Sequence, residues 1–126
     1  MEVTAPSSAT WAQAPEDRFT GSVSMAPLNK IADPGLQATV VRFEPGAHTY
    51  WHSHAEGQVL HILSGYGQVV SGDGTRVKVT GGDVVTVPPG EVHWHGASAD
   101  SSMTHISVTA GDTVWSTEVS ESDYSI

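Results

Sequence analysis

Turn signals recur along this chain at intervals of about 8 to 12 residues, and they restrict the folds open to it. Short runs rich in Val, Thr and aromatic residues are separated by turn sequences such as EPG, SGDG, TGGD and PPGE. No segment long enough for a typical helix carries the apolar stripe of an amphipathic helix. The sequence therefore predicts an all-β barrel or sandwich. Strands are expected at residues 20–25, 37–43, 48–54, 58–63, 67–71, 76–80, 84–87, 92–95, 103–109 and 113–119.

The length of 126 residues predicts one domain, large enough to bury a hydrophobic core. Residues 1–18 are rich in Ala, Pro, Ser and Thr and show no periodicity, so we expect an extended N-terminal arm. The barrel domain is expected to occupy residues 19–126.

Strand alternation assigns the faces of the expected strands. In the strand 103–109, Met103 and His105 share one face, while Ile106 and Val108 share the other. If His105 points into the barrel, an Ile/Val stripe points out and needs a cover. The same alternation predicts that Val77 faces inward.

Three histidines crowd into the run WHSHAEGQVLHILSG, which otherwise has the pattern of a buried strand. In an extended strand, His52 and His54 project to the same side, roughly 7 Å apart, and can converge on one ion. Gln58 opens the next strand, and His93 directly follows the turn at PPGE. These four side chains are our candidate ligands for a divalent metal ion. His48 and His61 lack such partners and are interpreted as hydrogen-bonded or surface residues.

The spacing of these residues resembles the two sequence motifs of the cupin superfamily. The matching positions of the first motif are Gly46, His52, His54, Gln58 and Gly65, and those of the second are Gly82, Pro88, Gly90 and His93. The resemblance spans about residues 36–110. It departs at two places, with Gln58 at a position that the family fills with Glu, and Ala97 at a position that it fills with Asn.

The resemblance implies a single-domain cupin, a double-stranded β-helix or jelly-roll barrel with a metal ion inside. Because Gln58 is neutral, the site keeps a charge of +2 instead of the +1 that a glutamate ligand leaves, which strengthens the ion as a Lewis acid. The ligand types suit Mn, and also Fe, Ni, Co or Zn. Glu56 falls in the turn before Gln58 and is not expected to replace it.

Longer segments, among them EPGAHTYWHSHAEGQVLHILSGYG and MTHISV, resemble small bacterial cupins that include manganese-dependent hydroxynitrile lyases. This resemblance implies manganese and reversible cleavage of a cyanohydrin to an aldehyde and cyanide. His105, on the strand after His93, is the candidate general base, and His95 a hydrogen-bond donor or pocket residue. Activity should then rise with pH through a pKa near 6 to 7, and an adjacent metal ion should lower that pKa, since like charges disfavour protonation.

Two alternatives stay open at this point. An iron-dependent dioxygenase acting on a small aromatic or enol substrate needs the same fold with open metal positions, although a neutral ligand set is less typical of oxygenases. A non-catalytic cupin that binds a small molecule needs no base at all.

Charge and composition limit the partners. The formal net charge is −9, with five Lys and Arg that form no cluster, so we expect no nucleic acid and no anionic membrane as partner. There is no cysteine, which excludes zinc–thiolate sites. No signal peptide is recognisable at the N-terminus, and we expect a cytoplasmic protein with a small-molecule substrate.

The exposed stripe predicts a homodimer in which the N-terminal arm or an outer sheet face forms the interface. Light scattering at micromolar concentration should give about twice the chain mass of 13.2 kDa. A monomer mass would contradict the prediction.

Overall fold

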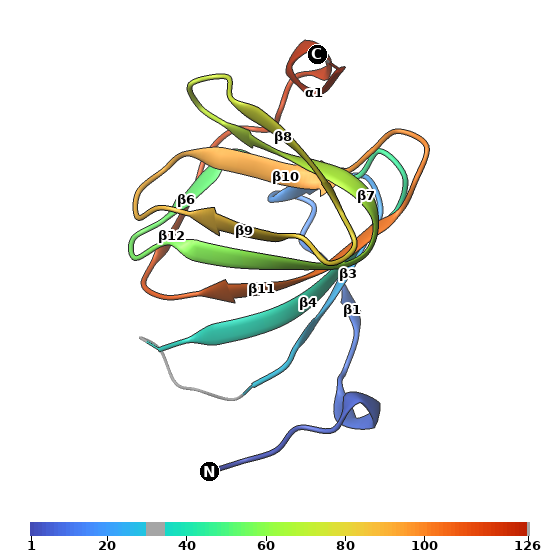
Figure 1. Ribbon diagram of the computed structural model, residues 1–126, viewed down its shortest axis with the longest axis vertical. Helices are drawn as coiled ribbons and strands as arrows, with labels where there is room; N and C mark the ends of the chain where they lie inside the picture. The colour runs from blue at the N-terminus through green and yellow to red at the C-terminus, as the bar shows by residue number, and fades with distance from the viewer. Residues whose placement is uncertain (30–34, 126) are drawn as a thin grey trace.

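The computed structural model describes residues 1–29 and 35–125, and in this part of the chain it is almost entirely β-structure (Figure 1). The strands are β1 (Ala12–Gln13), β2 (Phe19–Thr20), β3 (Val23–Pro27), β4 (Gln37–Phe43), β5 (His48–Thr49), β6 (His52–His54), β7 (Gln58–Ser71), β8 (Arg76–Thr80), β9 (Val84–Val87), β10 (His93–Ala97), β11 (Met103–Thr109) and β12 (Thr113–Trp115). A 3₁₀ turn, η1 (Pro6–Ser8), and a short helix, α1 (Glu121–Ser125), lie near the ends. The predicted all-β jelly-roll barrel is confirmed.

Strand β7 belongs to both walls of the barrel. Its first half pairs with β11 and β9, and its second half pairs with β10 and β8, all antiparallel. The sequence predicts two strands here, at 58–63 and 67–71, with the segment SGYG between them as a turn, and this prediction is wrong. Gly65 has a φ of 82°, and a side chain there would collide with the Ser102 carbonyl. The glycines therefore bend one continuous strand from one sheet into the other instead of ending it.

The expected strand 48–54 is also divided differently. In the pairing with β10, Gly96 is opposite His48 and His93 is opposite His52. Three residues along β10 therefore correspond to four residues along the segment 48–52. One extra residue is therefore inserted between β5 and β6, as in a β-bulge. The bulge reverses the alternation, so that His48 contacts Trp94 and Tyr124 on the outside while His52 faces the interior.

The main core lies between the two sheets. Its fully buried members include Phe43, Leu60, Ile62 and Met103, and Met103 lies on the same face of its strand as His105, as predicted. Val77 pairs with the buried Val69 and shares its inner face, yet it is 47% exposed. Val77 therefore points inward as predicted, but it is not buried, because it lines a hollow between β8 and β9.

The outer face of the β4–β11–β7–β9 sheet carries the apolar stripe predicted from strand alternation. Register places Val108 beside Val59 and Ile106 beside His61, and Ile106 and Val108 are both half-buried. Val59 is 39% exposed and Leu63 45% exposed. The homodimer stays a prediction.

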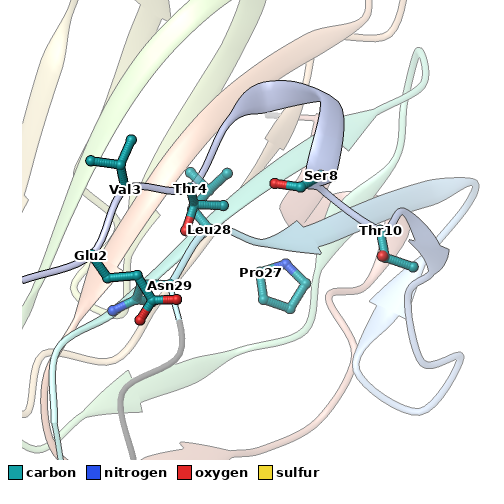
Figure 2. A pocket seen from close by; sticks show the side chains of 8 residues that line it. All are labelled: Glu2, Val3, Thr4, Ser8, Thr10, Pro27, Leu28 and Asn29. Atoms are coloured by element: carbon teal, nitrogen blue, oxygen red, sulfur yellow. The ribbon is translucent and has the colours of Figure 1, made fainter.

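The two chain ends contact the barrel to different extents, and residues 1–8 are exposed. Strand β1 pairs with β3, and the segment before it borders a hollow of about 340 Å³ with residues at the end of β3 (Figure 2). The hollow is lined by Glu2, Val3, Thr4, Ser8, Thr10, Pro27, Leu28 and Asn29. At the other end, Val119 and Tyr124 cover Trp94 in a second apolar cluster. Within the described residues, no helix is long and apolar enough to span a membrane.

Candidate metal centre

The centre of the candidate site is a cross-strand pair of imidazoles. His52 on β6 and His93 on β10 are register partners in an antiparallel pair, so both side chains leave the sheet on the inner face. Their ring centroids lie 4.3 Å apart, and both residues are almost completely buried. Two strands from distant parts of the sequence therefore place two potential ligands against one another.

Two further histidines flank this pair. His54 follows His52 on β6, with ring centroids 5.0 Å and 5.5 Å from those of His52 and His93. His95 follows His93 on β10, and His52, His93 and His95 each have a ring nitrogen within 4.8 Å of the others. The tightest triad thus contains His95, for which the sequence predicts a position beside the ligands. All four residues converge in one buried cluster.

In three of these histidines, His52, His54 and His93, a hydrogen bond at Nδ1 orients the ring. Nδ1 of His52 lies 2.8 Å from the Tyr50 carbonyl, and Nδ1 of His93 lies 2.9 Å from the Glu91 carbonyl. A carbonyl only accepts, so these Nδ1 atoms donate, and the lone pair of each neutral ring is at Nε2. Nδ1 of His54 is 2.9 Å from the Thr113 hydroxyl oxygen. Such partners are typical of metal-binding histidines.

Gln58, at the start of β7, completes the group that the sequence predicts. Its amide nitrogen donates to the Ser107 hydroxyl at 2.8 Å, and its carbonyl oxygen lies 2.9 Å from Nε2 of His93. Because Nδ1 of His93 already carries the proton, Nε2 of His93 and the carbonyl oxygen of Gln58 are both acceptors, and their lone pairs repel. A cation bound by both atoms would remove this repulsion.

The donor set fits a divalent transition metal ion. Nε2 of His54 is buried without a partner, and so is Nε2 of His95. An unpartnered buried acceptor costs free energy unless something binds it. Imidazole nitrogens with one amide oxygen are suitable ligands for Mn, Fe, Co, Ni or Zn. The buried histidine triad thus fits a metal site.

His105 stands behind the cluster and bonds to it. Its Nε2 lies 3.0 Å from Nδ1 of His95, and its Nδ1 has no partner. Two neutral imidazoles have two N–H groups between them, and one of these forms this hydrogen bond. The second N–H is at one of the two outer nitrogens, Nε2 of His95 or Nδ1 of His105, and the remaining outer nitrogen has a free lone pair. The pair can therefore accept one proton at its outer end and transfer another along the bond.

Burial keeps these imidazoles neutral. Desolvation is the largest cause that lowers the pKa of His105 and that of His54, each to about 4. The pKa values of His52 and His95 are lowered well below 6.5, first by burial and then by neighbouring imidazoles. The expected governing pKa of about 6 to 7 is therefore too high for His105, because that value belongs to an exposed ring.

The sequence pattern does not specify which side chains contact the candidate ligands, although strand alternation places Ser107 on the same face as His105. Ser107 and Thr113 bond to candidate ligands, and the ring of Trp115 lies 4.6 Å from that of His52. The buried Thr49 hydroxyl accepts a hydrogen bond from the backbone N–H of His95 at 3.2 Å. Only the three-dimensional register of β5, β11 and β12 brings these side chains to the histidines.

The remaining candidates lie away from the centre. His48 bonds through Nδ1 to the Gly46 carbonyl at 2.8 Å, and His61 is exposed on the outer sheet face. Glu56 is exposed in the turn before β7. Trp94, between two site histidines in sequence, packs away from them in the second apolar cluster.

Comparison with known proteins agrees with this geometry. Residues 39–114, more than half of the chain, match the family described as the Cupin domain. The chain is a cupin. Its buried histidines thus occupy the interior of a fold already recognised from the motif spacing.

This cupin resembles a hydroxynitrile lyase in sequence. It is 42% identical over 109 residues to a protein of Granulicella tundricola named (R)-mandelonitrile lyase, covering 86% of this chain and 83% of that protein. Among solved structures, a cupin-like protein from Thermotoga maritima is 36% identical, with a TM-score of 0.86 and 90% coverage of both chains. A polyketide cyclase from Streptomyces resistomycificus, 19% identical with a TM-score of 0.77 over 98% of this chain and 90% of that chain, shows the shared fold alone.

The lowered pKa values predict how the stability of the metal-free protein depends on pH. Between about pH 6.5 and pH 4 the unfolded chain binds more protons than the folded chain, because the folded pKa of His54 and of His105 is about 4. Stability should be fully present above about pH 6.5 and decrease as the pH falls towards 4. Urea unfolding of EDTA-treated protein across this range measures it.

The control is the exposed His61. A His61→Gln variant should keep the same decrease in the urea midpoint, whereas His105→Gln should make the decrease smaller, because one of the contributing buried rings is removed. A midpoint that does not change between about pH 7 and pH 4.5 would contradict the buried neutral state of these rings.

Proposed function

We propose that this cupin is a metal-dependent hydroxynitrile lyase, which cleaves a cyanohydrin reversibly to an aldehyde and cyanide. The observation that carries the proposal is the hydrogen-bonded His95–His105 pair beside the buried ligand cluster, in a chain 42% identical to an (R)-mandelonitrile lyase. His52, His54, Gln58 and His93 would hold one divalent ion, with manganese as the first choice. When bound, the ion supplies Lewis acidity and a positive charge at the substrate hydroxyl.

The chain's own residues handle the proton. In the proposed reaction, the His95–His105 pair accepts the hydroxyl proton of the cyanohydrin, with His105 as the base that finally holds it. The bond between the carbinol carbon and the nitrile carbon then breaks, its electron pair leaves with cyanide, and a carbonyl group forms. The pair returns the proton to cyanide, so no proton is gained or lost overall.

Charge and cavity size support a small substrate and an anionic product. Among the described residues no Asp or Glu is buried, so no buried carboxylate offsets the charge of an ion in the cluster. A hollow of about 150 Å³ reaches His93, and its wall combines apolar side chains, Val69, Val77 and Val85, with polar ones that include Asp73 and Glu91. Its size suits a small substrate, and the valines offer contacts to an apolar substituent.

The metal assignment predicts different results for neighbouring histidines. His52→Ala should lose stoichiometric metal, because its Nε2 faces the centre of the cluster, whereas His95→Ala should retain it. Gln58→Glu should bind metal as tightly or more tightly and change activity, since the site loses one positive charge. Elemental analysis of purified variants measures this. A His52→Ala protein with full metal content would refute the ligand set.

The base assignment predicts that His105→Ala keeps its metal but cleaves (R)-mandelonitrile roughly 10²- to 10⁴-fold more slowly. The pKa of about 4 at His105 means that the ring stays neutral, and able to accept a proton, down to mildly acidic pH. Wild-type turnover, followed by benzaldehyde release, should therefore fall only as the pH approaches that value.

The same assays separate the other function classes. A dioxygenase would consume O₂ and lose activity when iron is replaced by manganese or zinc. A binding protein would turn over no substrate, and His105→Ala would change only its affinity. Full mandelonitrile cleavage by His105→Ala would assign His105 a structural role.

A further inference from the structure

The three hydrogen-bonded candidate histidines differ in what holds them. The Nδ1 atoms of His52 and His93 donate to backbone carbonyls, which no substitution removes. His54 is instead held by a side chain, the Thr113 hydroxyl on β12, 2.9 Å from its Nδ1. His54 and Thr113 are direct register partners on β6 and β12, so the two side chains leave the sheet on the same face.

The tautomer of a histidine decides which nitrogen can bind a metal. A neutral ring has one N–H and one lone pair, and the hydrogen bond at one nitrogen sets the state of the other. Nε2 of His54 is buried without a partner beside His52 and His93. It can serve as a ligand only when Nδ1 carries the proton.

We propose that Thr113 is a positioning residue, whose hydroxyl accepts a hydrogen bond from Nδ1 of His54 and thereby turns a free Nε2 lone pair toward the metal centre. This inference rests on the metal site of the proposed function, and not on the reaction. Without the hydroxyl, metal-bound His54 has a buried N–H with no acceptor. In the metal-free state the proton of His54 can move to Nε2, so that no N–H is left without an acceptor at Nδ1. Loss of the hydroxyl therefore weakens metal binding more than it destabilises the metal-free protein.

The test compares three variants of the full-length protein. Thr113→Val keeps the β-branched shape and removes the hydroxyl, and it should weaken Mn²⁺ affinity roughly 10- to 100-fold, as is usual when the hydrogen-bond partner of a metal-binding histidine is lost. Thr113→Ser keeps the hydroxyl and should remain near wild type. Thr104→Val makes the same change on the outward face of β11 and should have no effect. Titration of metal-free protein with Mn²⁺ in a calorimeter measures all three.

A second readout follows the tautomer without metal. Long-range proton–nitrogen NMR spectra of metal-free wild type should show His54 protonated at Nδ1, and Thr113→Val should shift the proton toward Nε2. If Thr113→Val does not fold, Thr113→Ala is compared with Thr113→Ser in its place.

The outcomes separate this inference from the lyase proposal. Equal Mn²⁺ affinity of Thr113→Val and wild type, or Nε2 protonation of His54 in the wild type, overturns the role of Thr113. Weaker Mn²⁺ binding in a protein that cleaves no cyanohydrin supports Thr113 and refutes the lyase. A wild type that binds no Mn²⁺ overturns this inference together with the metal site.

Discussion

The pairing of β7 with four other strands is the interaction on which the rest of the molecule depends. β7 begins at Gln58, pairs with β11 and β9, bends at Gly65 and continues between β10 and β8. Its two principal neighbours carry His105 on β11, and His93 and His95 on β10. β6 and β12 then join through β10. A slip of one residue along β7 would turn its own inward side chains, Gln58 among them, to the opposite face, so the register of this strand determines whether Gln58 meets the histidines.

The arrangement is costly because it replaces apolar core by imidazole. Five buried histidines, His52, His54, His93, His95 and His105, share one interior, and burial lowers the pKa of each below 6.5. Hydrogen bonds offset part of that cost, but Nε2 of His54 and of His95 is left without a partner. A metal ion that binds Nε2 of His54 removes that atom's part of the cost. A site of this kind therefore links metal binding to folding stability.

Much of the centre could be predicted from sequence, because the ligands lie at short, regular separations within strands. His52, His54 and Gln58 are on consecutive strands, and the turn before His93 is evident from its proline and glycine residues. The bulge between β5 and β6 was not predictable, since nothing in HTYWH distinguishes an inserted residue from a regular strand. Likewise the glycines near Gly65 have the composition of a turn, and only their packing against Ser102 shows a bend. The contacts of Thr113 and Ser107 depend on pairing across distant strands, which one sequence does not specify.

The neutral amide of Gln58 connects the structure to the proposed chemistry. A carboxylate at this position would hold an ion more firmly, but it would also reduce the positive charge that stabilises an alkoxide and a departing cyanide. Among the described residues no buried acid lies in the cluster, so no buried carboxylate reduces that charge. The proton acceptor is then required to be neutral as well, because an imidazolium beside the ion would be repelled. Burial of the His95–His105 pair meets this requirement, since the same desolvation that lowers the pKa of His105 keeps its lone pair free near neutral pH.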